Sequence, residues 1–138
     1  MLIELRPLLV RLNNIKRMRS ADEPLRSLAE RSFARTWRDL AAGADVETVA
    51  WREAAAAVAT VVLGAIDSAS LRRAGLAEDR VHTMLCTAIA NAGDTLTPAV
   101  LQRLTAAVPA LISSASNTVD PAPGFVHRLQ DQPRAGAT

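Results

Sequence analysis

The sequence has little of what small enzymes and metal proteins commonly use for chemistry. Its 138 residues include one cysteine, two histidines and no tyrosine. A single cysteine excludes an intramolecular disulfide and a zinc site built from several thiolates. The sequence also contains no glycine-rich phosphate loop and no nucleophile elbow. We therefore predict a non-catalytic protein with no cofactor and no metal.

Aromatic residues and strand-forming runs are scarce as well. Aromatics make up 3% of the chain, whereas alanine alone supplies 27 residues. Alanine, leucine, arginine and glutamate all favour helices, so we expect an all-α protein. The longest uncharged apolar run, 54–66, has 13 residues, and a membrane-spanning helix needs about 20. With no secretory signal visible, we expect a cytoplasmic protein in which this run is a buried helix.

The charge is almost balanced, with 16 basic and 14 acidic residues. A net charge of +2 is too even to predict nucleic-acid binding by itself. Fifteen of the basic residues are arginines and only Lys16 is a lysine. Together with the alanine content, this bias indicates a GC-rich bacterial genome.

Apolar residues recur at helical spacing in five segments, which predicts a compact antiparallel bundle of about five helices. We expect them near 7–19, 24–42, 46–74, 78–92 and 98–113. The third, capped by Asp45, is apolar on all faces from Ala54 onward and should be the centre. Its break at 67–70 is an alternative end, and Pro109 should kink or split the last helix.

Glycines and polar residues mark the expected helix ends. Gly43 and Gly75 are predicted C-terminal caps in the left-handed conformation, and Thr97 is a predicted N-cap. The bundle domain should cover 1–115. The remainder, 116–138, is polar and proline-containing, and we expect a mobile tail. Within it, Phe125 belongs to a short apolar segment that is a candidate for docking to a partner.

The candidate partner-binding residues lie mainly in the first helix, which has one apolar and one basic face. Its leucine stripe must be buried, either in the bundle or against another chain. The candidates are Leu8, Arg11, Leu12, Ile15, Trp51 and Phe125. We therefore expect a small accessory or adaptor protein that acts by association with itself, as a homodimer, or with a larger protein.

DNA binding by a helix-turn-helix is the alternative. The corner at 40–55 has a suitable glycine, but Asp39 lies at the close-approach position and Arg52 lies where an apolar anchor is required. The segment from Arg72 to Met84 fits better, and its candidate DNA-binding residues are Arg72, Arg73, Arg80 and His82. Its preceding helix is expected to be too long for this motif.

Two smaller groups have structural explanations. Asp79, His82 and Cys86 share one helical face, but they lack a fourth ligand and more simply represent a buried thiol beside a boundary histidine. Trp37 and Trp51 flank the Gly43 corner and are expected to hold it together. Trp51 has a second interpretation, as an exposed anchor for another subunit. A ligand-binding bundle is the third and least favoured functional class.

Overall fold

The structure is a computed structural model that describes residues 2–19, 25–64, 66 and 68–116. In this part of the chain there are helices and links between them but no strand. The helices are α1 (Leu2–Ile15), α2 (Leu28–Ala41), α3 (Val46–Leu63), α4 (Ser68–Arg73), α5 (Glu78–Ala92), α6 (Pro98–Ala106) and α7 (Val108–Ser116). The predicted all-α bundle is confirmed. Apart from Ser116, the proposed tail and Phe125 lie outside the described residues.

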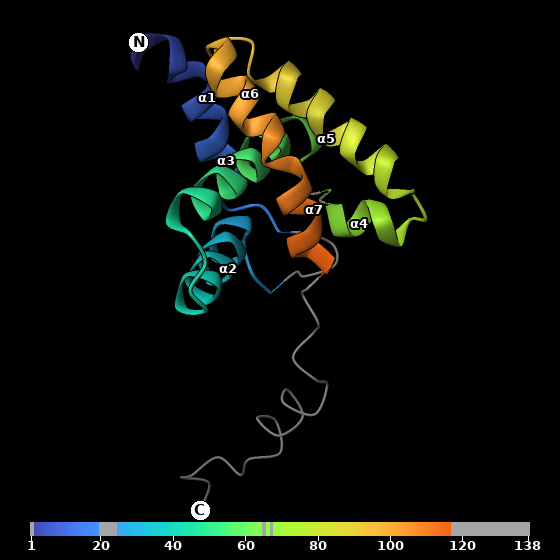
Figure 1. Ribbon diagram of the computed structural model, residues 1–138. Helices are drawn as coiled ribbons and strands as arrows, with labels where there is room; N and C mark the ends of the chain where they lie inside the picture. The colour runs from blue at the N-terminus through green and yellow to red at the C-terminus, as the bar shows by residue number, and fades with distance from the viewer. Residues whose placement is uncertain (1, 20–24, 65, 67, 117–138) are drawn as a thin grey trace, which may run out of the picture.

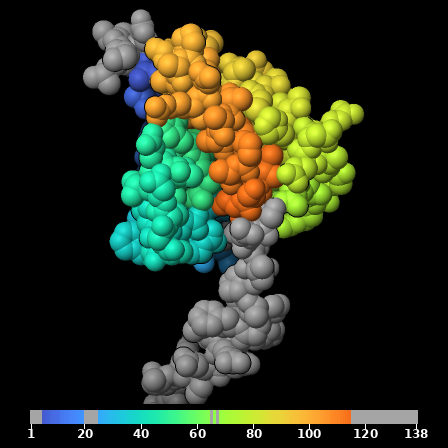
Figure 2. All heavy atoms as spheres, viewed as in Figure 1, coloured from blue at the N-terminus to red at the C-terminus, as the bar shows by residue number. Residues whose placement is uncertain are grey.

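Helix α3 is the centre of the bundle, as its apolar pattern predicted. It contacts α1, α2, α5, α6 and α7 (Figure 1). Ala55, Val58 and Ala59 are buried on it, and the two alanines allow neighbouring helices to approach closely. In Figure 2, α6 and α7 fill the space between α3 on one side and α4 with α5 on the other. The core therefore forms around α3, with α5 and α7 as its main partners.

The helix ends follow the predicted chemistry at four positions. The Asp45 carboxylate accepts a hydrogen bond from the backbone N–H of Thr48 at 2.9 Å. Thr97 caps α6 in the same way, and Pro98 follows it in the first turn. Gly43 and Gly75 adopt φ values of 89° and 90°, a conformation that side chains with a Cβ rarely adopt. These capping predictions are confirmed.

The start of two helices differs from prediction. Helix α1 begins at Leu2, so Pro7 lies inside it and not at its first turn. Helix α2 begins at Leu28, because Ser27 forms a reciprocal capping box with Glu30. Residue 24, where this helix was expected to start, lies outside the described residues.

Two predicted helices are each divided. The third helix ends at Leu63, where Gly64 has a φ of 65°, and α4 follows as a separate helix of six residues. The last helix splits at Ala107, as predicted, because Pro109 cannot donate a backbone hydrogen bond and so starts a new helix, α7. None of the helices in the described ranges combines the length and apolar character required to cross a membrane.

Candidate binding site at helices α2 and α3

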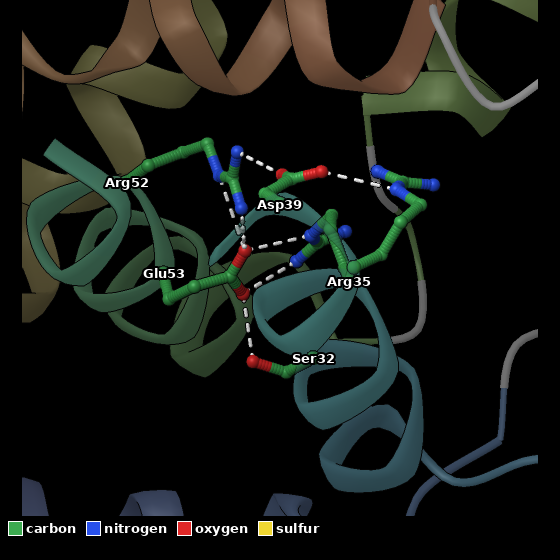
Figure 3. A network of polar contacts seen from close by, with 6 residues as sticks. Ser32, Arg35, Asp39, Arg52 and Glu53 are labelled. Atoms are coloured by element: carbon green, nitrogen blue, oxygen red, sulfur yellow. Dashed lines mark hydrogen bonds and ion pairs between the residues drawn. The ribbon is translucent and has the colours of Figure 1, made fainter. Parts of the chain in front are cut away.

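Helix α2 attaches to α3 through a network of polar side chains (Figure 3). The Glu53 carboxylate is at its centre. Arg35 donates to both of its oxygens, from Nε and Nη2, at 2.7 Å each. Ser32 Oγ donates to Glu53 Oε2 at 2.7 Å, and Arg52 Nη2 donates to Oε1 at 2.9 Å. One carboxylate on α3 is thus bound by two residues of α2 and by its own neighbour.

Arg52 extends the network to the end of α2. Arg52 is only 7% exposed, and its Nη1 lies 2.5 Å from Asp39 Oδ2. The other Asp39 oxygen accepts from Arg38 Nε at 3.0 Å. A buried guanidinium needs nearby anions, and Arg52 has two. The network therefore satisfies the charges that the α2–α3 contact encloses.

Both carboxylates remain ionised because of these partners. Burial by itself raises the pKa of Glu53, but hydrogen bonds and charge from Arg35, with further bonds from Ser32 and Arg52, outweigh burial and hold that pKa below its ordinary value. Burial also raises the pKa of Asp39, and the bonds from Arg38 and Arg52 more than compensate, so this pKa is lowered too. At neutral pH the network carries full charges of both signs.

Because Ser32, Arg35 and Asp39 turn inward on α2, the aromatic residues on the opposite face turn outward. Phe33 and Trp37 are 71% and 68% exposed, and their rings stack with centroids 6.4 Å apart and planes 7° from parallel. At 100° per residue, these two lie across the helix from Ser32, Arg35 and Asp39. No residue of α2 is buried. Phe33 and Trp37 therefore do not contribute to the core of the bundle.

The expected roles of the two tryptophans are wrong. Trp37 does not hold the Gly43 corner together, because it is exposed on the outer face of α2. Trp51 is half-buried against the core instead. The Arg103 guanidinium lies 5.4 Å from the centre of its ring, and Arg103 Nη1 also pairs with Glu47 at 2.7 Å. Trp51 thus joins α3 to α6.

A cavity of about 350 Å³ lies between α2 and the rest of the bundle. Its inner wall includes Leu85 and Leu111, two buried core residues. Its polar wall is formed by Lys16, Arg31, Ser32, Arg35, Glu53, Thr60 and Ser68. The volume is within the range of small-molecule sites, about 300–1,000 Å³, which are commonly apolar with a few polar groups. Helix α2 therefore has an exposed apolar surface on one side and a cavity on the other.

The predicted partner-binding residues of the first helix lie mostly inside the bundle. Leu8 is buried in the core, and Leu12 packs against it. Leu12 and Ile15 line the cavity, whereas Arg11 is exposed. The bundle thus covers most of the leucine stripe itself, which leaves α2 with the larger exposed apolar face.

The residues of the DNA-binding alternative fall on α4 and α5. Helix α4 is short, so the objection to a long preceding helix does not apply. However, Glu78 and Asp79 occupy the first turn of α5, the helix that would enter the groove, and their charges oppose phosphate. Arg72, Arg73 and Arg80 are exposed, but His82 is half-buried beside Cys86.

Cys86 behaves as a structural thiol in this arrangement. Its Sγ lies 3.8 Å from His82 Nδ1, and burial raises its pKa, which favours the protonated, unreactive form. Within the described ranges, no three histidine, cysteine, aspartate or glutamate residues are close enough together to hold a metal ion.

The sequence contains a signal for this network, but Arg52 was interpreted only as a departure from the helix-turn-helix pattern. Arg52 follows Val49 by three residues and precedes Ala55 by three, which is the register of the buried face of α3. A charged residue in that register requires a buried counter-ion.

Comparison with known proteins identifies no function for this site. The chain matches no protein-family model, and no curated protein and no solved structure is significantly similar to it.

Proposed function

We propose that this protein is a small accessory or adaptor protein that forms a homodimer through the outer face of α2. The observation that carries the proposal is the stacked pair Phe33 and Trp37, exposed on a helix whose inner face is polar. Solvent exposure of two stacked aromatic rings is unfavourable unless another surface covers them. The single cysteine is consistent with action in the reducing cytoplasm.

The exposed area is appropriate for a weak dimer. An aromatic side chain buries roughly 150–250 Å², so two that are about 70% exposed present roughly 300 Å² per copy. A standard interface buries about 800 Å² per partner, and somewhat more than half of that is apolar. The pair therefore supplies most of the apolar area for an interface at the small end of this range, which is typical of weak, transient complexes.

The charges beside the aromatic pair favour a second copy as the partner. Glu30 lies on the same face one turn before the pair, and Arg38 follows Trp37 directly. If two α2 helices cross antiparallel with a two-fold axis at Ala34, Glu30 of one copy lies opposite Arg38 of the other. The same axis brings each Trp37 within one turn of the other copy's Phe33. This surface is thus complementary to itself, which a two-fold dimer requires.

Sedimentation velocity over a range of concentrations tests the proposal. The 14.7 kDa chain should sediment as a dimer at high concentration and as a monomer on dilution. Trp37→Ser should be monomeric throughout, with unchanged helicity by circular dichroism. The matched control is Leu9→Ser, which removes an apolar side chain that is 53% exposed on α1 and should leave the dimer intact.

Charge reversal provides a second test of the same arrangement. Arg38→Glu should weaken the dimer at least tenfold, and Arg38→Glu combined with Glu30→Arg should restore it; circular dichroism checks that α2 stays folded, because Glu30 also caps this helix and Arg38 also binds Asp39. A wild-type chain that stays monomeric, or a Leu9→Ser variant that dissociates while Trp37→Ser does not, overturns the proposal. Tight, salt-sensitive binding of duplex DNA by the monomer would favour the helix-turn-helix alternative instead.

A further inference from the structure

We infer that the cavity between α2 and the bundle binds a single-chain aliphatic carboxylate of about ten carbon atoms. This inference is separate from the proposed dimer, because the cavity lies on the inner side of α2 and Phe33 and Trp37 lie on the outer side. Three features of the cavity support it, namely its volume, the charge of its wall and a serine hydroxyl on that wall.

The cavity has room for an alkyl chain and an apolar end to receive it. It measures about 350 Å³, and at roughly 30 Å³ per water-sized group it accommodates about twelve such groups, the size of a ten-carbon carboxylate. Leu85 and Leu111 place its inner end against the core. Several of its wall positions are alanines, namely Ala29, Ala56, Ala57, Ala59 and Ala69. These small side chains leave the volume unfilled.

The charged residues of the wall select an anion. Lys16, Arg31 and Arg35 carry positive charge and Glu53 carries the only negative charge, so the lining has a net charge of +2. The Glu53 carboxylate is already bound by Ser32, Arg35 and Arg52. It therefore repels an incoming anion only weakly. Lys16 is exposed, whereas Arg31, Arg35 and Glu53 are half-buried, so Lys16 marks the end of the cavity that opens toward solvent.

Ser68 adds a hydroxyl group to the same wall. The residue is 5% exposed and lines the cavity. Its hydroxyl can donate a hydrogen bond to an oxygen atom of a bound carboxylate.

Isothermal titration calorimetry with sodium decanoate tests the inference on the full chain at neutral pH. We expect one decanoate per chain. Decanol and decyltrimethylammonium should each bind at least tenfold more weakly, because they lack the negative charge. Equal affinity for the three probes, or no heat of binding with decanoate, overturns the inference.

Matched variants locate the binding site. Lys16→Glu should weaken decanoate binding at least tenfold, whereas Arg17→Glu removes a neighbouring exposed cation outside the cavity and should have less than a twofold effect. Ala56→Leu should fill the cavity and abolish binding, with its fold checked by thermal melting. If Ala56→Leu does not fold, methyl NMR of the wild type decides: decanoate should shift Leu85 and Leu111 but not Leu104, which is in the core away from the cavity.

The dimer and the ligand site are distinguishable in these experiments. The monomeric Trp37→Ser variant should bind decanoate with wild-type affinity. Loss of binding in this variant, with its fold intact, would contradict a site within one chain.

Discussion

Arg52 Nη1 and Asp39 Oδ2 lie 2.5 Å apart across the corner between α2 and α3. In a DNA-binding helix-turn-helix, an apolar residue would be expected at the position of Arg52 and a small residue at the position of Asp39. Here a buried cation and a half-buried anion satisfy each other instead. The corner is therefore held by a polar contact, and the same contact determines which face of α2 points outward.

Removal of the central carboxylate of the network should strongly destabilise the fold. Glu53→Ala leaves Arg35 and buried Arg52 without their shared partner, and we expect a loss of about 3 kcal/mol in the free energy of unfolding. Urea denaturation at neutral pH measures this loss. The control is Glu47→Ala, which breaks the exposed pair with Arg103 and should cost less than about 1 kcal/mol. Equal losses in the two variants would contradict the importance of burial.

Acid should weaken the bundle through the same carboxylates. The folded pKa values of Glu53 and Asp39 are below their ordinary values of 4.5 and 3.8, so the unfolded chain takes up protons first as the pH falls. Their contribution is fully present above these ordinary values and is lost as the pH falls through the folded pKa values. Denaturation of Glu53→Gln across this range should show a shallower decline than the wild type. An identical decline would show that Glu53 does not contribute.

The two tryptophans should differ in solvent access, because Trp37 is 68% exposed and Trp51 is half-buried. In the single-tryptophan variant Trp51→Phe, the remaining Trp37 should be quenched strongly by acrylamide at low protein concentration. In Trp37→Phe, the remaining Trp51 should be quenched weakly, because it packs against the core. Acrylamide is preferable to iodide, since Arg103 beside Trp51 would attract an anion. Comparable quenching of both would contradict the placement of α2.

Gly93 is required for the close approach of α5 and α6. A Cβ at this position would lie 2.6 Å from Leu101 Cδ2 and 3.0 Å from Leu96 Cδ1. We expect Gly93→Ala to lower the free energy of unfolding by about 1–3 kcal/mol because of this crowding. Asn91→Ala, at an exposed position on the same helix, should change it by less than about 0.5 kcal/mol. Thermal and urea denaturation check both, and a neutral Gly93→Ala would show that the leucines move aside.

The partner-binding residues predicted on the first helix show what an apolar pattern determines and what it leaves open. The leucine stripe of α1 indicates a face that must be covered, and Leu8 is indeed buried. The pattern does not say whether the covering surface belongs to the same chain. That answer depends on where α3 and its neighbours lie in space.

The sequence by itself determined the helices and their order in this protein. Apolar periodicity and helix caps depend on residues only a few positions apart, so they can be recognised in the sequence. The caps recognised in this way are Asp45, Thr97 and the glycines at 43 and 75. Tertiary structure alone decided which face of α2 turns inward and what cavity remains behind it. Phe33 and Trp37 face solvent because Ser32, Arg35 and Asp39, on the other face of α2, find partners on α3 that are 13 to 21 residues away. Interactions over that separation depend on how helices pack, and periodicity within one helix carries no information about them.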